Sequence, residues 1–209
     1  MLLLSRLIGH KLTALVILLG LGIGLLIVPL LTGHLGANPL EKLLHQSGQI
    51  AIWLLVAVLA LTPLRVLFSK SPLVAALNRH RRWIGVAACI YGVLHFACHV
   101  LYEGDPAAIL KSFSKPFIWF GLAGLTLLIV LALTSNNWSM RKLGGRTWKR
   151  LHRLAYVAAA LLLWHQTIAG KGHWHDSRWL IFPLIALELA RVLKPRLFPK
   201  SPASSPQKV

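Results

Sequence analysis

The sequence predicts an all-α integral membrane protein, a bundle of six transmembrane helices with both termini in the cytoplasm. Hydrophobic residues make up 56% of the 209 residues and charged residues only 13%, about half the charged share of a soluble domain. The apolar residues form runs long enough to cross a bilayer, which needs about 20 of them. Lysine and arginine gather between the runs and fall mostly on one side. A single helical membrane domain explains all three observations.

The first three predicted spans cover residues 12–31, 47–64 and 83–102. No charged residue occurs from Leu12 to Leu40. Arg6 and Lys11 resemble the basic start of a signal peptide, but the apolar stretch is too long for one and lacks a small-residue cleavage site. We therefore expect a retained first helix.

The other three predicted spans cover residues 116–134, 151–168 and 179–193. The sixth is the weakest, because Glu188 and Arg191 interrupt it. From Lys194 onward the chain is basic and rich in proline and serine, which is typical of disorder. We expect one transmembrane domain over residues 1–200 and a disordered basic cytoplasmic tail over residues 201–209.

The orientation follows from the lysine and arginine count in the loops. With six spans, alternate loops share a side, and one side takes 18 of the 23 cations. Four of the five acidic residues fall on the other side. The positive-inside rule then places the cation-rich side and both termini in the cytoplasm. The formal net charge of +18 is mainly an orientation signal, so we expect no nucleic-acid partner, which such a charge would indicate in a soluble protein.

The sequence offers no catalytic residues of its own. Cys89 and Cys98 fall in one apolar run, where a helix holds their Cα atoms about 13 Å apart, too far for a disulfide. There is no CxxC metal site, no GxGxxG dinucleotide fingerprint and no catalytic triad. We therefore expect any terminal catalysis to be carried out by a partner protein.

Two histidines lie deep within predicted spans. His95 lies about 18 Å beyond the cytoplasmic start of the third span, and His165 about 20 Å beyond His152 at the start of the fifth. Both therefore come out in the outer half of the bilayer, on helices that run in the same direction. Imidazole in a lipid span usually marks a bound group or a proton path, and two imidazoles can ligate a heme iron from opposite sides. We predict His95 and His165 as a ligand pair; the alternative is two structural histidines.

Two further histidines lie near this outer pair. His99 is one helical turn after His95 on the same face. It is a rival ligand, a propionate contact or a plain interfacial residue. His45, at the outer end of the second span, could contact the same cofactor from a third helix.

At the cytoplasmic edge, His80 and His152 lie at matching depth and as a pair could hold a second heme. One geometric point limits this idea. The 13 residues between His152 and His165 rotate the side chain by about 140° in a regular helix. The two share a face only if that helix is tilted, kinked or bulged.

Several motifs together resemble a known family: Asn38-Pro39 with His45, Thr62-Pro63-Leu64-Arg65, Arg81-Arg82-Trp83-Ile84-Gly85, Leu94-His95, Leu131-Ala132-Leu133-Thr134-Ser135, and Arg150-Leu151-His152-Arg153-Leu154-Ala155-Tyr156 with His165. In order and spacing they resemble the heme-binding membrane subunits of the bacterial periplasmic protein-methionine-sulfoxide reductase system. That group belongs to the ferric-reductase-like transmembrane family. The resemblance runs over nearly the whole chain.

The resemblance implies a multi-pass b-type cytochrome of the bacterial inner membrane that binds FMN and one heme b, with a second heme b allowed. It implies electron transfer from the quinone pool, or from a cytoplasmic flavin reductase, to a periplasmic molybdopterin-containing methionine-sulfoxide reductase. That partner repairs oxidised periplasmic proteins. The family's ligand histidines map onto His95, His152 and His165. The cytoplasmic basic loops, which topology alone explains, could also dock an acidic donor or hold a flavin phosphate.

Two other interpretations stay open at this stage. The chain could be another heme b membrane subunit, such as a b561-like oxidoreductase or a respiratory-complex anchor. It could also be a heme-free transporter or scaffold, in which the histidines relay protons or bond to carbonyls. A reduced-minus-oxidised spectrum separates the heme proteins from the heme-free class.

Overall fold

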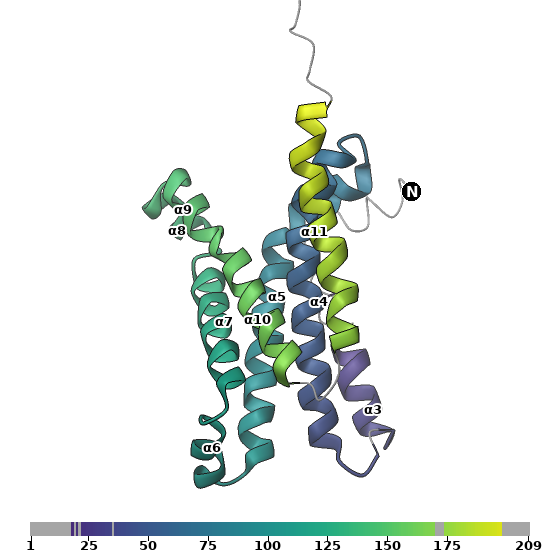
Figure 1. Ribbon diagram of the computed structural model, residues 1–209, viewed down its shortest axis with the longest axis vertical. Helices are drawn as coiled ribbons and strands as arrows, with labels where there is room; N and C mark the ends of the chain where they lie inside the picture. The colour runs from purple at the N-terminus through teal and green to yellow at the C-terminus, as the bar shows by residue number, and fades with distance from the viewer. Residues whose placement is uncertain (1–17, 19, 21, 35, 170–173, 198–209) are drawn as a thin grey trace, which may run out of the picture.

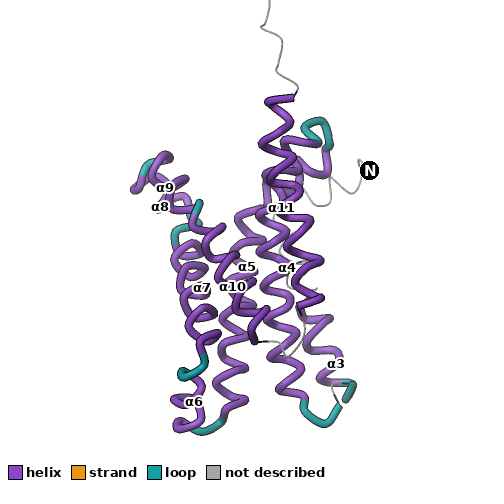
Figure 2. Tube along the Cα trace, in the orientation of Figure 1, coloured by secondary structure: helices purple, strands orange, loops and turns teal. Residues whose placement is uncertain are grey.

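The computed structural model describes residues 18, 20, 22–34, 36–169 and 174–197 (Figure 1). Residues 12–17, 19 and 21 of the predicted first span, and the whole of the predicted tail over residues 201–209, lie outside the described residues. The described chain consists of helices joined by turns, and it contains no strand (Figure 2). The predicted all-α fold class is confirmed.

The described helices, in chain order, are a π-helix η1 (Ile23–Ile27), α3 (Val28–Leu31), α4 (Pro39–Leu67), α5 (Pro72–Glu103), α6 (Pro106–Ser112), α7 (Pro116–Leu133), α8 (Asn137–Leu143), α9 (Gly145–His152), α10 (Leu154–Ala169) and α11 (Trp174–Leu197).

Local signals in the sequence set the ends of the long helices α4 and α5. The Asn38 side chain accepts a hydrogen bond from the amide of Glu41, and the Ser71 hydroxyl accepts one from the amide of Val74. Each cap satisfies an amide that the first helical turn leaves unpaired, and a proline, which has no amide, follows each cap. α5 ends at Gly104, whose φ of 67° is accessible to glycine at little cost.

Among the described helices, α4, α5 and α7 are long and apolar enough to span a membrane. The chain is therefore a membrane protein. α4 and α5 extend beyond the predicted spans 47–64 and 83–102, because their capped first turns carry the helix past the apolar run. α7 matches the predicted span 116–134 to within one residue.

The fifth predicted span differs from the structure. Instead of one helix over residues 151–168, α9 ends at His152 and α10 begins at Leu154, with Arg153 between them. The indole nitrogen of Trp148 donates to the Thr134 carbonyl at 2.9 Å, which holds α9 against the end of α7. α10 has 16 residues, fewer than the roughly 20 that cross a bilayer.

The helices form two antiparallel pairs, α4 with α5 and α7 with α10, and α11 packs against α4 (Figure 1). One end of the bundle carries the turn before α4, the short helix α6 and the acidic residues Glu41, Glu103 and Asp105. The other end carries the α4–α5 connection and the basic helices α8 and α9. The described connections therefore alternate between the two ends as the predicted topology requires.

The core lies where α4 meets α5 and α10. Leu55 and Leu59 of α4 are each 2% exposed, while Ala88 of α5 and Ala158 of α10 are fully buried in the same cluster. In lipid, where apolar burial does not drive helix association, small side chains let helices approach closely and gain van der Waals contact. The alanines therefore allow the two helix pairs to close on each other.

A polar contact also joins the two pairs. Gln166 of α10 donates through Nε2 to Oε1 of Gln49 on α4 at 2.9 Å. Both side chains are half-buried. A hydrogen bond between membrane helices contributes about 0.6 to 2 kcal/mol. Because Gln166 is the neighbour of His165, this bond helps to fix the depth of α10 against α4.

We expect Gln166→Leu to destabilise the folded protein by about 1 kcal/mol, because Gln49 loses its partner. Gln49→Leu should cost a similar amount, and the double variant little more than either single one. Unfolding by sodium dodecyl sulfate in mixed micelles, followed by tryptophan fluorescence, measures the three values. Thr126→Val is the control, because this exposed hydroxyl bonds within its own helix to Leu122. Fully additive effects of the two glutamine substitutions would contradict the assignment.

Candidate functional site

His95 of α5 and His165 of α10 lie beside each other inside the bundle. Their ring centroids are 6.2 Å apart, and the ring planes are inclined by 83°. The two residues come from different helix pairs, and the packing of α4 with α10 brings them together. The structure thus joins the two histidines that the depth argument places in one half of the bilayer.

Each imidazole is held by a backbone carbonyl of the neighbouring helix. Nδ1 of His95 lies 2.8 Å from the Leu44 carbonyl oxygen on α4, and Nδ1 of His165 lies 2.7 Å from the Phe117 carbonyl oxygen on α7. A carbonyl can only accept, so in both rings Nδ1 must carry the proton and donate it. The lone pair of each neutral ring is then on Nε2, which is the nitrogen left for a metal.

This geometry fits a heme iron. Two imidazoles that share one metal from opposite sides hold their ring centroids about 6 Å apart, given metal–nitrogen bonds of about 2.0–2.1 Å. A metal-ligating histidine almost always donates its other ring N–H to a carboxylate, carbonyl or water, as both rings do here. The described residues include no group of three or more histidine, cysteine or acidic side chains suited to a metal. A heme supplies four ligands from its macrocycle, so two histidines suffice.

His99 and His45 take different positions around this pair. Nε2 of His99 lies 3.4 Å from the Ser112 hydroxyl oxygen. That hydroxyl donates its own proton to Ile109 at 2.7 Å, so it accepts from His99, and Nε2 of His99 carries a proton. His45 is exposed on α4. Neither residue is arranged like the outer pair.

His80 is 4% exposed on α5, and neither of its ring nitrogens has a hydrogen-bond partner. Such a buried polar group is costly without a partner. The sequence prediction pairs His80 with His152. The structure gives no contact between the two, and His80 does not line the cavity that His152 lines.

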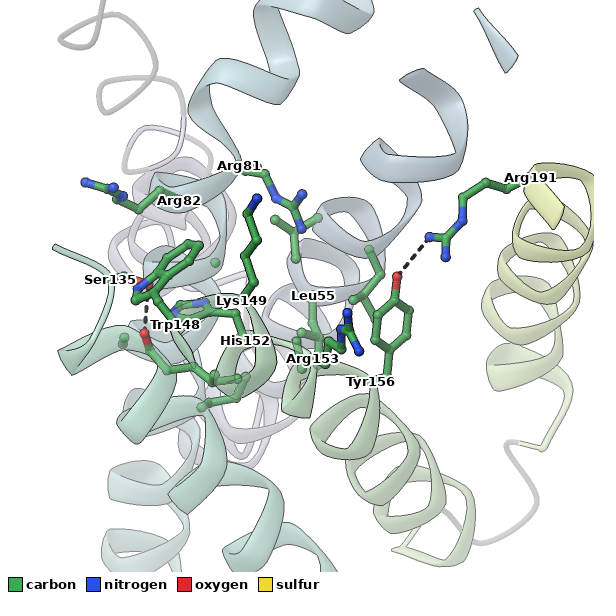
Figure 3. A pocket seen from close by; sticks show the side chains of 17 residues that line it. Leu55, Arg81, Arg82, Ser135, Trp148, Lys149, His152, Arg153, Tyr156 and Arg191 are labelled. Carbon is green, nitrogen blue, oxygen red and sulfur yellow. Dashed lines mark hydrogen bonds between the residues drawn. The ribbon is translucent and has the colours of Figure 1, made fainter. Parts of the chain in front are cut away.

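His152 lies at the basic end of the bundle, beside a cavity of about 470 Å³ (Figure 3). Its ring stacks on Trp148 with the centroids 3.9 Å apart, and its Nε2 lies 3.3 Å from the Thr134 hydroxyl. Burial lowers the pKa of His152, the positive charge of Arg81 lowers it further, and a hydrogen bond with Thr134 opposes both. The imidazole is therefore neutral at neutral pH, which is the form that binds metals.

The cavity combines an apolar wall with a cationic lining. Its walls come from α4, α5, α7, α9, α10 and α11. Leucine, valine and alanine form the apolar part. The cations that line it are Arg81, Arg82, Lys149, Arg153 and Arg191. Such a surface suits a flat, largely apolar molecule that carries carboxylate or phosphate groups.

The sequence predicts these cations mainly as an orientation signal, with a donor contact or a flavin phosphate as a second use, and it does not predict the cavity. It also marked Glu188 and Arg191 as interruptions of the sixth span. In the structure the two form a 2.9 Å ion pair, and Tyr156 of α10 donates to Glu188 at 3.0 Å. Arg191 donates in turn to the Tyr156 hydroxyl at 3.3 Å (Figure 3). Lysine and arginine recur close to Trp148, His152 and Tyr156 in the sequence. This clustering of cations with aromatic residues and a histidine could have indicated the site.

Comparison with known proteins identifies the family. Residues 47–163 match the ferric reductase like transmembrane component family. The protein-methionine-sulfoxide reductase heme-binding subunit MsrQ of Brucella anthropi is 36% identical over 185 residues, covering 84% of this chain and 79% of the relative. The MsrQ subunits of Brucella ovis and Brucella canis are each 37% identical over 180 residues, with the same coverage. No solved structure matches the chain.

The family match covers α5 and α7 in full and α4 from Ser47 onward, and it includes His95 and His152. It ends two residues before His165. The similarity to the Brucella subunits extends over most of both chains. The chain therefore belongs to the ferric-reductase-like transmembrane family, among the heme-binding subunits of the protein-methionine-sulfoxide reductase.

Proposed function

We propose that this chain is a membrane b-type cytochrome that carries electrons across the bacterial inner membrane, with His95 and His165 as the axial ligands of a heme b. The observation that carries the proposal is the pair of neighbouring imidazoles, each with Nδ1 bonded to a carbonyl and Nε2 available. The heme-binding role that the relatives' names state supports it. A histidine with a purely structural role needs only a hydrogen-bond partner. Such a role does not require two histidines to lie with their ring centroids 6.2 Å apart.

The chain's residues would hold the heme and set its properties. The bound group supplies one-electron chemistry at iron. The Leu44 and Phe117 carbonyls keep a proton on each Nδ1, which raises the basicity of the ligand nitrogen and favours the ferric form. His99 has Nε2 engaged with Ser112, which favours a contact to the cofactor's edge over ligation. His45 is the corresponding candidate from α4.

A second cofactor would occupy the cavity beside His152. Its cations would pair with the propionates of a second heme b or with the phosphate of FMN, and its apolar walls would cover the flat ring system. Nε2 of His152 lies 3.3 Å from the Thr134 hydroxyl, which itself donates to the Val130 carbonyl, so this nitrogen would have to give up its proton and this contact before it could bind a metal. His80 is buried with both nitrogens unpaired but does not line this cavity, so it is not placed to serve as a partner ligand there.

The partners follow from the same reasoning. Electrons would come from the quinone pool or from a cytoplasmic flavin reductase, which an acidic surface would dock on the basic end of the bundle. They would leave at the opposite end to a periplasmic molybdopterin-containing methionine-sulfoxide reductase. That partner would carry out the reduction of methionine sulfoxide in oxidised proteins. This chain would contribute no catalytic residues.

We also propose six membrane spans, with both termini in the cytoplasm and the domain extending over residues 1–200. α4, α5 and α7 are three of the spans. α10 and α11 would be the fifth and sixth, and the first would include residues 12–31. The basic connections share one end of the bundle, and Glu41, Glu103 and Asp105 lie at the other (Figure 1), which supports a cytoplasmic assignment of the basic end.

We expect the purified protein from heme-replete cells to show a b-type reduced-minus-oxidised spectrum. His95→Ala and His165→Ala should each remove one equivalent of heme per polypeptide, because one axial ligand is lost. His99→Ala should keep it. Heme and flavin are quantified by the pyridine hemochrome assay and by flavin fluorescence. Full heme content in both the His95 and the His165 variants would rule out the ligand assignment.

The same assay identifies the occupant of the cavity. We expect His152→Ala, or the pair Arg81→Gln and Arg153→Gln, to remove a second equivalent of heme or the flavin while the outer heme stays. The cations and apolar walls of the cavity suit either a heme or FMN. The measured amounts of heme and flavin per polypeptide show which of the two binds. Unchanged heme and flavin content in these variants would show that the cavity holds neither.

Orientation is tested by cysteine labelling. Cys89 and Cys98 are buried, and replacing both with alanine gives a background without reactive thiols. Lys70 and Lys111 are exposed at opposite ends of the bundle. We expect a membrane-impermeant maleimide, added to cells with a permeabilised outer membrane, to label Lys111→Cys but not Lys70→Cys. The reverse pattern would invert the proposed topology.

A further inference from the structure

His95 and His165 reach their carbonyl partners through the same arrangement on two different helices. His95 donates to Leu44, and the residue four positions later is Gly48. His165 donates to Phe117, and the residue four positions later is Gly121. In an α-helix the carbonyl of residue i already accepts from the amide of residue i+4. The imidazole therefore uses the second lone pair of that oxygen and must approach beside residue i+4.

Glycine leaves the space for that approach. A Cβ atom on Gly48 would lie 2.7 Å from Nδ1 of His95 and 3.0 Å from Cε1. A Cβ atom on Gly121 would lie 2.7 Å from Nδ1 of His165 and 2.8 Å from Cε1. Both glycines are helical with negative φ, so backbone conformation does not require them. Their role is steric, and the two sites match to within a few tenths of an ångström.

Other crowded glycines of the helices face different partners. A Cβ on Gly124 would lie 2.6 Å from the Leu162 side chain, and one on Gly92 would lie 3.1 Å from Leu125. These leucines are flexible side chains at helix contacts and can adjust. Among the described glycines, only Gly48 and Gly121 would place a Cβ against an imidazole. These rings cannot move away without losing their hydrogen bonds.

We propose that Gly48 and Gly121, each with the carbonyl four residues before it, form two histidine notches that fix the direction and the proton position of the axial ligands. A histidine notch is thus Leu44 with Gly48, or Phe117 with Gly121. The glycines are positioning residues, because they act on the cofactor through the imidazoles. The inference rests on the proposed ligation of heme by His95 and His165.

The notches have a measurable electronic consequence. They lie on α4 and α7, in different helix pairs, and they hold the two ring planes at 83°. Nearly perpendicular imidazoles give a low-spin ferric heme a highly anisotropic electron paramagnetic resonance signal. The Nδ1 hydrogen bonds increase ligand basicity and lower the reduction potential. A Cβ in either notch displaces the ring and weakens both effects.

We expect Gly48→Ala and Gly121→Ala, each in the full-length protein, to weaken heme affinity by about tenfold or more. The heme that remains should have a higher midpoint potential and an altered paramagnetic resonance signal. Gly124→Ala is the matched control, because it lies on α7 three residues from Gly121 and crowds Leu162 instead of an imidazole. It should keep the wild-type spectrum and potential even if it lowers stability.

Three outcomes separate the inference from the proposed function. Heme-free wild-type protein, or full heme in the His95→Ala and His165→Ala variants, refutes the proposed function. Loss of heme in those two variants, with wild-type spectrum and potential in Gly48→Ala and Gly121→Ala, overturns the notches alone. A change in Gly124→Ala equal to that in Gly121→Ala also overturns them, since helix packing would then be the cause.

One measurement needs no substitution and covers variants that fail to fold. Electron–nuclear double resonance of the wild-type ferric protein in deuterated buffer reports the Nδ1 protons of the ligands. We expect these protons to be strongly hydrogen-bonded and slow to exchange, because a helix carbonyl accepts each one. Freely exchanging, weakly bonded Nδ1 protons would overturn the proposal.

Discussion

The arrangement of this bundle depends on one kind of contact, the hydrogen bond from an imidazole Nδ1 to a backbone carbonyl of the adjacent helix. An imidazole inside a lipid span is costly unless it has a partner, and here the partner is a carbonyl that a helix already uses. Each bond ties the depth of one helix to that of its neighbour, α5 to α4 and α10 to α7. The Gln49–Gln166 bond then ties α4 to α10. Together these contacts place two imidazoles from distant parts of the chain at one level.

The opposite end of the bundle is organised by charge. The cations from which the positive-inside rule predicts the orientation of the chain also line a cavity with apolar walls. Several of them have fixed partners: Arg81 donates to Thr62 at 3.2 Å and Arg82 to Asn137 at 2.9 Å. Orientation in the membrane and recognition of an anionic ligand are therefore compatible uses of the same side chains. One explanation does not exclude the other.

Much of this architecture could be predicted from the sequence. Hydropathy and charge gave the fold class and the bounds of α7, and depth alone placed His95 near His165. The short helices α6, α8 and α9 were not expected, because segments of seven or eight residues depend on caps and tertiary contacts more than on periodicity. The break at Arg153 lies next to a helix that the Trp148–Thr134 hydrogen bond joins to the end of α7, and no local pattern links those two residues.

The carbonyls and glycines beside His95 and His165 could not be predicted from the sequence, because groups of both kinds occur throughout the chain. Every residue has a carbonyl, so nothing marks Leu44 or Phe117 as an acceptor. The sequence contains 16 glycines, and most apolar runs include one, so Gly48 and Gly121 do not stand out. The cavity needs walls from six helices, and their packing is a property of the whole fold. Only the cations near His152 and Tyr156 gave a local hint.

The break at Arg153 separates the registers of the two ends of the molecule. In a continuous helix, adding one residue turns everything beyond it by about 100°, so the spacing between His152 and His165 would dictate their relative direction. Here His152 belongs to α9 and His165 to α10, and each takes its rotation from its own contacts. A one-residue change of spacing at the break can be absorbed in the turn. Length variation there is therefore compatible with an unchanged placement of His95 beside His165.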